Sequence, residues 1–396
     1  MNTLTTKQIY TIMNNINSQA QGRTTIAPIN TGEFVSVGTK LLQTGVENIY
    51  GAVSQVLSRS IFSSRVYNSR NLDALRVSAN TFGNMTRKIS FCEVDLTPNM
   101  AFLSPLSTDA AITGWSAENP FKIRKTDVYQ TNFYGRSTVA DYFTLSEDQL
   151  KVAFRDPSEM AQFYYGIVTN EQNKIKQTLE RFAASTRNNF IGGVLAGTQA
   201  PQVFRAVTAY NAETGNTYTA TDIKKPGIFE PFTRWLYGEM KTIMRKMGDR
   251  GVRYHQQVNG KTILRHTSIN DMRAFVAVKI YNQFESMVNS MTFQPSESPF
   301  RNMYQVTYWQ NPDDELAIDI VPEGMAADGT SLQLPAVKQD NIICVIMDRD
   351  AAGWSLVSNK TSVINNPLAE YSNTHYKLVL KAWNDFTENA VVILLE

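Results

Sequence analysis

The chain has 396 residues, which at roughly 150 residues per domain predicts two or three domains, and its 42% hydrophobic content excludes global disorder. With 38 basic and 36 acidic residues the net charge is only +2, so the basic surplus of a dedicated DNA-binding domain is missing. Two distant cysteines exclude a disulfide framework, and the lack of any apolar run of about 18 residues predicts no membrane span.

The N-terminal region predicts an arm followed by a helix. Residues 1–31 are rich in Asn, Thr and Gln and lack the apolar core of a signal peptide, so we expect a protein that is made and kept inside a cell, or assembled there. Between residues 32 and 57, apolar side chains recur at steps of three and four residues. This spacing predicts an amphipathic helix that needs a partner surface.

A projecting flap is predicted next. Two strand-like runs, Met85–Leu96 and Phe121–Leu145, enclose a long segment rich in turn residues. Two strands with a long excursion between them predict a flap over residues 85–142. Taken alone, the basic residues on its two legs are solvated charges that discourage unwanted pairing at a strand edge. These residues are Arg87, Lys88, Lys122, Arg124 and Lys125.

The longest predicted element is a helix over residues 156–191. Its apolar residues fall on one face, and the opposite polar face includes Arg187. We expect Gly192 and Gly193 to stop it. At 1.5 Å per residue it would be about 50 Å long, a strut with one face on a sheet. The residues that predict the start of this long helix are Asp156, Pro157 and Glu159. A short helix starting at Ser146 is predicted just before it.

The C-terminal half predicts a separate α/β lobe over residues 226–345, after a polar, turn-rich stretch at 203–222. The lobe would contain a helix opening at Pro231, then a strand followed by a helix capped by Ser268, then strand–turn–strand patterns. The chain closes with two strands around a polar turn at Asn384–Asn389. The run AVVILL after this turn is apolar on both faces and predicts a central strand.

The sequence contains no pattern that predicts catalysis or metal binding. His255, His266 and His375 lack the spacing of metal ligands. The VNGKT stretch lacks the first glycine of a phosphate-binding loop, and the acidic turns lack the further ligands of a calcium site. We therefore predict no catalytic, cofactor-binding or metal-binding residue, and no cofactor.

The order of these parts resembles the major capsid proteins of tailed bacteriophages, above all those of small short-tailed phages. The segments that carry the resemblance are KTDVYQTNFYGRSTVADYFTLSEDQLKVAF leading into the long helix, TILRHTSINDMRAFVAVKI, and the closing YKLVLKAWNDFTENAVVILLE. The resemblance covers nearly the whole chain and implies the α+β Johnson fold. It assigns residues 1–65 to an N-terminal arm and helix, 85–142 to an extended loop, 66–84, 143–225 and 346–396 to a peripheral domain with a long spine helix, and 226–345 to an axial domain.

The resemblance implies a structural protein and not an enzyme. Such a protein assembles in the host cytoplasm, as hexamers and pentamers, into the icosahedral shell of the virion that encloses the double-stranded DNA genome. Its implied partners are copies of itself, scaffolding and portal proteins, and the packaged DNA through non-specific contact, with no membrane. The basic flap residues would face carboxylates on the neighbour's strut and set the register of the contact. These carboxylates are Glu147, Asp148 and Glu159.

Two other classes remain open on the sequence alone. A cellular nanocompartment shell of the encapsulin type would share the fold without packaging DNA, although the N-terminal arm favours the phage interpretation. An enzyme with a mixed α/β core would need a deep pocket with converging polar groups.

Overall fold

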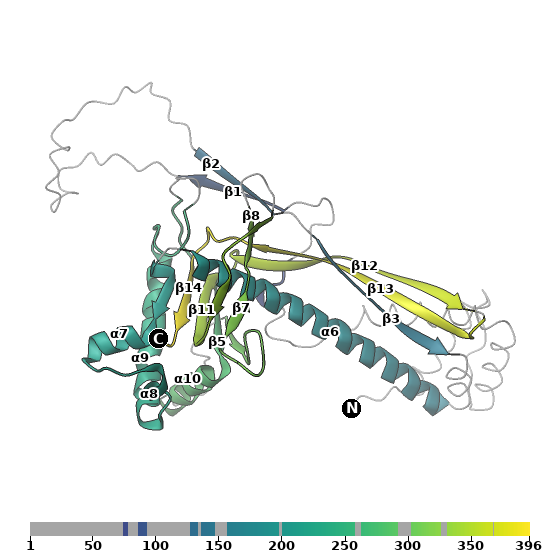
Figure 1. The fold of residues 1–396 in the computed structure, drawn as a ribbon, viewed down its shortest axis with the longest axis horizontal. Helices are drawn as coiled ribbons and strands as arrows, with labels where there is room; N and C mark the ends of the chain where they lie inside the picture. Colours follow the sequence, from purple (N-terminus) through teal and green to yellow (C-terminus); the bar gives the residue numbers. More distant parts are fainter. Residues whose placement is uncertain are drawn as a thin grey trace, which may run out of the picture. The chain divides into compact units, whose positions relative to one another are not determined.

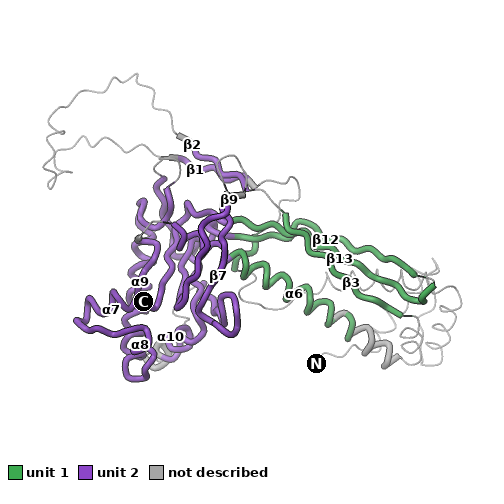
Figure 2. Tube along the Cα trace, viewed as in Figure 1, with its two compact units in different colours: residues 1–83, 135–186, 353–383 green, residues 84–134, 187–352, 384–396 purple. Residues whose placement is uncertain are grey.

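The structure is a computed structural model that describes residues 74–77, 86–92, 127–133, 136–146, 157–197, 200–257, 263–291, 302–325, 331–366 and 368–396. The arm and helix predicted over residues 1–65 lie outside these ranges, as does nearly all of the short helix predicted from Ser146. The chain divides into two compact units (Figure 2). The first comprises residues 1–83, 135–186 and 353–383, and the second comprises residues 84–134, 187–352 and 384–396.

The long predicted helix exists as α6, Pro157–Ala196, which has 40 residues. Its residues up to 186 belong to the first unit and the rest to the second. The predicted stop at Gly192 and Gly193 is wrong, because α6 continues through both. A β-carbon on Gly192 would lie 2.6 Å from the side chain of Ile320, and one on Gly193 would overlap the ring of Phe386. The two glycines therefore serve close packing and not helix termination.

In the first unit, α6 lies along one face of a three-stranded sheet (Figure 1). The strand order is β12 (Ala352–Asn366), β13 (Tyr371–Asn384), β3 (Ser137–Ser146). Phe182 of the helix packs edge-on against Trp354 at 6.4 Å between ring centroids. The predicted flap leg Phe121–Leu145 is therefore wrong in its second half, because β3 pairs with β13 and not with the flap.

The second unit contains a five-stranded sheet in the order β4 (Val203–Arg205), β14 (Ala390–Leu394), β11 (Ile342–Asp348), β5 (Met272–Ala277), β6 (Met303–Val306). β14 pairs antiparallel with β11 and parallel with β4, and every one of its residues is buried. The prediction of a central strand at AVVILL is confirmed. Residues 384–396, which include β14, belong to the second unit. The expected division instead grouped them with the strands before the turn, in a peripheral domain that included residues 346–396.

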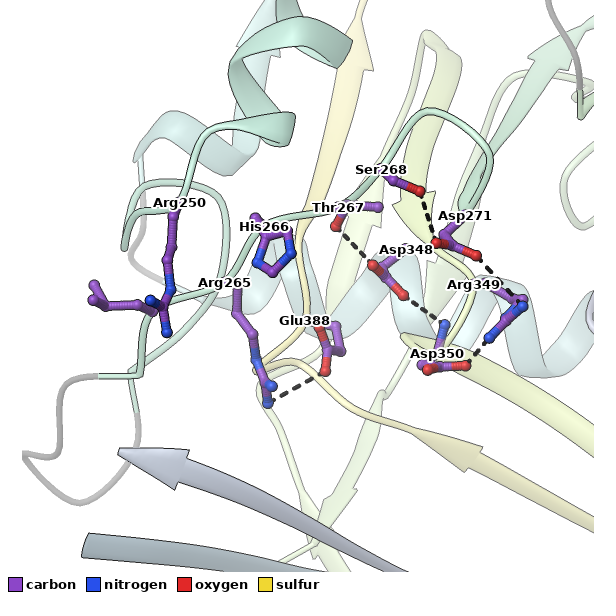
Figure 3. A pocket seen from close by; sticks show the side chains of 11 residues that line it. Arg250, Arg265, His266, Thr267, Ser268, Asp271, Asp348, Arg349, Asp350 and Glu388 are labelled. Carbon is purple, nitrogen blue, oxygen red and sulfur yellow. Dashed lines mark hydrogen bonds and ion pairs between the residues drawn. The ribbon is translucent and has the colours of Figure 1, made fainter. Parts of the chain in front are cut away.

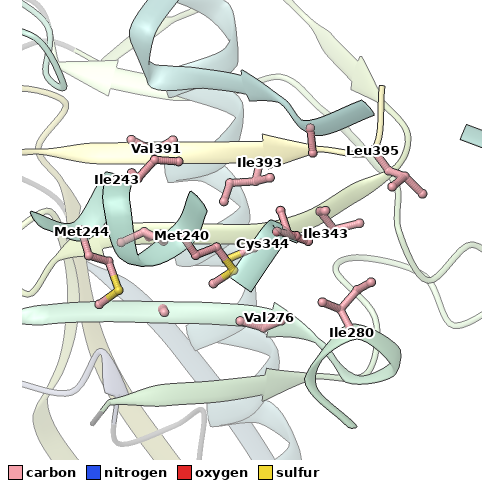
Figure 4. Close-up of a cluster of buried hydrophobic side chains, with 14 of the residues drawn as sticks. Met240, Ile243, Met244, Val276, Ile280, Ile343, Cys344, Val391, Ile393 and Leu395 are labelled. Atoms are coloured by element: carbon pink, nitrogen blue, oxygen red, sulfur yellow. The ribbon is translucent and has the colours of Figure 1, made fainter. Parts of the chain in front are cut away.

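Helices cover a face of this sheet. α9 (Pro226–Gly248) places Met240, Ile243 and Met244 over the strands, where they meet Cys344 and Ile393 (Figure 4). The predicted helix is confirmed, although α9 begins at Pro226 and Pro231 lies inside it. The other helices are α7 (Ala206–Thr214), α8 (Ala220–Ile223) and α10 (Val278–Met291).

Two predictions for the second unit are wrong. The stretch at 203–222 is not only turns, since it holds β4, α7 and α8, the last with a capping box between Thr219 and Asp222. The helix expected from Ser268 is instead β5, followed by α10 from Val278. The reason is burial: almost every residue of β5 is buried, and a fully buried strand has no alternation that would distinguish it from a helix.

The position of Arg187 contradicts the prediction that it lies on the outward polar face of the long helix. It is buried in the second unit, with its guanidinium 4.9 Å from the centre of the Trp309 ring and hydrogen-bonded to the Trp309 carbonyl oxygen. Burial lowers the pKa of Arg187 to about 10. A buried arginine therefore joins the end of α6 to the loop that carries Trp309.

Three two-stranded sheets complete the second unit. The flap is a hairpin of β1 (Thr86–Cys92) and β2 (Asp127–Phe133), paired antiparallel from Thr86 with Phe133 to Cys92 with Asp127. The predicted two-stranded flap is thus confirmed over these residues. The other two pairs are β7 (Ile318–Ile320) with β10 (Val337–Gln339), and β8 (Glu323–Met325) with β9 (Ser331–Gln333). Within the described ranges, no helix has the length and hydropathy needed to cross a membrane.

Candidate functional site at the base of the flap

The two faces of the flap hairpin differ in chemistry. On one face Ser90 and Phe133 are buried against the chain's own second unit. On the opposite face Ile89 is 48% exposed, Phe91 64% and Val128 46%. Phe91 and Val128 are direct cross-strand partners, so these apolar side chains lie together. The hairpin therefore has an anchored face, which holds Ser90 and Phe133, and an open face, which holds Ile89, Phe91 and Val128.

Lys88 lies on the anchored face and pairs with two buried carboxylates of its own chain. Its Nζ is 2.8 Å from Asp385 Oδ2 and 2.5 Å from Glu388 Oε1. The lysine is about 300 positions before these two residues in the sequence, so only the tertiary fold brings them together. The contact fastens β1 to the turn between β13 and β14.

Arg265 makes a second link between the same two segments. Its Nη2 donates to Ser90 Oγ at 2.8 Å and lies 3.2 Å from Glu388 Oε1. Its Nε donates to the Thr387 carbonyl oxygen at 3.0 Å. The arginine thus holds β1 and the turn from a third position in the chain.

The turn Asp385–Asn389, called the junction turn below, also meets helix α6 and the five-stranded sheet. The ring of Phe386 stacks on Phe190 of α6 at 5.6 Å and covers Gly193. The Asp348 N–H of β11 donates to the Asn389 carbonyl oxygen at 2.9 Å. Asn389 Oδ1 lies 3.1 Å from Nδ1 of His255, which is buried. One short turn therefore contacts the flap, the end of the long helix and the sheet.

Burial and charge act in opposite directions on the three ionisable groups at this joint. Burial favours the neutral form of Lys88, but Asp385 and Glu388 outweigh it and raise the lysine pKa. Burial would raise the pKa of Asp385, yet the neighbouring Lys88 ammonium and the hydrogen bonds from Thr387 hold it below its usual range. For Glu388 burial prevails over Lys88 and Arg265, and its pKa is raised. The lysine thus lies between one firmly ionised carboxylate and one that is easier to protonate.

A pocket of about 320 Å³ lies beside the junction turn (Figure 3). Most of its charged groups pair with one another. Arg265 lies 3.2 Å from Glu388, Arg349 lies 3.4 Å from both Asp271 and Asp350, and the Thr267 hydroxyl donates to Asp348 at 2.7 Å. Among the described residues no group of three His, Cys, Asp or Glu side chains could hold a metal ion. The pocket has the chemistry of a structural joint, with its polar groups turned toward each other.

The three histidines occupy different settings. His255 is buried, and its Nε2 lies 2.7 Å from the Ile263 carbonyl oxygen. His266 lines the pocket beside the junction turn. His375, in the first unit, packs against the ring of Tyr142 at 5.3 Å.

The predicted contact residues are separated by the structure. Arg87 and Lys88 are neighbours on β1, but Arg87 shares the open face with Ile89, whereas Lys88 is paired within its own chain. Glu159 falls in the first turn of α6. The remaining predicted residues lie outside the described ranges: Lys122, Arg124, Lys125, Glu147 and Asp148.

The sequence does not reveal the role of the junction turn. It predicts a polar turn at these positions, and that turn exists. Two acids in a short polar turn are normally solvated, and only their distant basic partners make them buried and paired. The available signal was the pair Asp385 and Glu388, which lies directly before the strongly apolar strand β14.

Comparison with known proteins shows which family has this architecture. Residues 9–394 match the model of the Phi29-like phage major capsid protein family. The capsid structure of Staphylococcus phage Andhra is similar in fold, with a TM-score of 0.53, 10% identity, and coverage of 85% of this chain and 86% of that one. A chain in the structure of the head fiber and inner core protein gp22 of bacteriophage P68 also has a TM-score of 0.53, with 9% identity over 84% of this chain and 85% of that one.

No curated protein sequence matches the chain. The family match nevertheless spans almost its full length, and the fold comparison agrees with it. This chain belongs to the Phi29-like phage major capsid protein family, and it is a shell-forming structural protein of the virion, not an enzyme.

Proposed function

We propose that the chain builds the icosahedral head of a tailed phage, as hexamers and pentamers around a double-stranded DNA genome. The observation that carries the proposal is the family match over residues 9–394. Assembly would take place in the host cytoplasm with a scaffolding protein and a portal protein as partners. The family match favours neither a nanocompartment shell nor an enzyme.

The open face of the flap is proposed as a contact surface for a neighbouring copy. A two-stranded hairpin alone is marginally stable in water, and this one leaves Ile89, Phe91 and Val128 uncovered in the single chain. A shell requires the same heterologous contact to repeat around each rotation axis. Covering these side chains on a second copy would bury apolar area at every such repeat.

Arg87 is proposed to assist this contact from the same open face. Together with the basic residues predicted farther along the flap, it would face the carboxylates predicted on the neighbour's strut and set register more than affinity. Lys88 is better placed to hold the flap from inside its own subunit, because its ammonium group already pairs with Asp385 and Glu388.

The two units are proposed to correspond to the two domains of the capsid fold. The first unit, with the sheet β12–β13–β3 and most of α6, would be the peripheral domain. The helices and five-stranded sheet of the second unit would form the axial domain at the centre of each capsomer, with the flap as the extended loop. A net charge of only +2 fits a shell that touches packaged DNA without gripping it.

Expression of the full chain, alone and with its scaffolding protein, tests the proposal. Sedimentation and negative-stain electron microscopy should show closed shells, or sheets and tubes of hexamers. A stable monomer that stays monomeric with the scaffolding protein present would refute it.

A further inference from the structure

We propose that Lys88, Arg265 and the junction turn form an ion-paired joint that fixes the direction of the flap in the single subunit, before any neighbour binds. Only the purpose of the joint, which is to direct the flap toward a neighbouring copy, rests on the proposed function. The joint itself is a property of one folded chain.

The first observation is the burial of the acceptors. The side chains of Asp385 and Glu388 are 2% and 9% exposed, and Lys88 Nζ lies within 2.8 Å of both. Ion pairs at solvated surfaces restrain little, whereas removing one partner of a buried pair leaves an uncompensated charge. Detaching the flap from the body would expose both carboxylates or leave them without the lysine.

The second observation is the rigidity of the turn. Asp385 Oδ1 accepts from the Thr387 N–H at 2.9 Å and from the Thr387 hydroxyl at 2.6 Å. The ring of Phe386 is wedged against Phe190 and Gly193 of α6. The carboxylates that receive Lys88 are therefore held in place by contacts that do not involve the flap.

The third observation is that the flap is held at two points. Lys88 binds the carboxylates, and Ser90, two residues on and about 6.6 Å along the strand, receives the bond from Arg265. A single attachment would leave the hairpin free to pivot. Two attachments on one strand fix both its position and its direction, which a subunit needs if its flap is to reach the same place on every neighbour.

The direction of the flap can be measured as a distance distribution in unassembled subunits. Spin labels would be placed at Val128→Cys on the open face and at Arg245→Cys on α9, where both side chains are exposed. Cys92→Ser removes a competing thiol, and Cys344 is fully buried. Double electron–electron resonance on the full chain then measures the distribution of distances between the two labels. Sedimentation confirms that the subunits are unassembled.

We expect a narrow distribution in the parent chain and, for Lys88→Met, one at least about twofold wider, because the buried pair loses its cation. Arg87→Met is the matched control, since Arg87 is the preceding residue on the same strand but points to the open face. It should leave the distribution narrow. A broad parent distribution, an unchanged one in Lys88→Met, or equal broadening in Arg87→Met would overturn the proposal.

If Lys88→Met fails to fold, as judged by near-ultraviolet circular dichroism, Asp385→Asn replaces it. That variant keeps the shape of the side chain and removes the charge of the carboxylate that lies 2.8 Å from the Lys88 ammonium group. Broadening supports the joint, and an unchanged distribution refutes it. Neither reading depends on shell formation, so failure of the joint and failure of the proposed function are distinguishable.

Discussion

Gly193 lies where helix α6 meets the junction turn, and the ring of Phe386 occupies the space that a β-carbon would need. A larger residue at such a site destabilises the fold in two ways. Its β-carbon overpacks against the neighbouring ring, and the backbone that carries the ring must shift. Gly166 of the same helix is exposed, and nothing lies within 4 Å of its hypothetical β-carbon. The two glycines therefore separate the packing effect from the intrinsic helix preference.

Gly193→Ala should lower the free energy of unfolding by about 1–3 kcal/mol, because Phe386 must move. Gly166→Ala should raise it by about 0.4–1 kcal/mol through the better helix preference of alanine. Urea denaturation of unassembled subunits measures both. Stabilisation by both variants would contradict the close approach of Phe386 to the helix.

The joint also predicts opposite pH effects from its two carboxylates. The lowered pKa of Asp385 means that its contribution to stability is present above its ordinary pKa of 3.8 and is lost as the pH falls through the folded value. The raised pKa of Glu388 means that stability declines as the pH rises from 4.5 through the folded value.

Asp385→Asn should therefore flatten the stability profile below pH 3.8, and Glu388→Gln should flatten the decline above pH 4.5. The measurement is the free energy of unfolding in urea from acid to neutral pH. Identical profiles for the two variants would contradict the assignment.

At the scale of elements, burial separates two kinds of strand in this protein. β14 is apolar at every position. It lies between β4 and β11, so both of its edges are paired, and all of its residues are buried, so both of its faces are covered. β2 carries a valine of the same size at position 128, but on the open face of the flap hairpin, where it is 46% exposed. An identical substitution at the two positions compares a central strand with an exposed one.

Val392→Thr should lower the free energy of unfolding by about 1–3 kcal/mol, because it buries a hydroxyl group at a position that packs a methyl group. Val128→Thr should change the stability of the single chain by about 0.5 kcal/mol or less, as for surface substitutions in general. Thermal unfolding followed by circular dichroism compares them. Equal costs would argue against a central position for β14.

Elements with a strong local pattern could be predicted from the sequence, and those set by distant contacts could not. The helix α9, the central strand β14 with its continuous apolar run, and the first part of the flap each have a local pattern that predicts the element. The end of α6, the separation of β3 from the flap and the strand β5 depend on which surfaces meet in three dimensions. Arg187 was predicted on the polar face of the long helix, and Lys88 as a solvated charge or a contact to a neighbour's carboxylates. Only Trp309 and the junction turn explain where these two side chains lie.

At the scale of the whole molecule, each subunit of a shell protein must be stable alone and complementary to its neighbours. The flap shows how one hairpin can meet both requirements. Its anchored face contributes Lys88 and Ser90 to contacts within the chain, and its open face leaves apolar side chains uncovered. Substitutions on the anchored face should therefore affect the folded subunit, and substitutions on the open face should affect shell assembly.

Phe91→Asp should leave the subunit folded, because Phe91 is 64% exposed, yet it should prevent closed shells by placing a charge in the contact with the next copy. Phe91→Tyr is the control, since it keeps the ring and should assemble. Urea denaturation of the unassembled chain tests the first statement, and sedimentation with electron microscopy tests the second. Shells of normal yield from Phe91→Asp would mean that the open face meets solvent in the assembled particle, and the contact between subunits would then have to be sought on another surface.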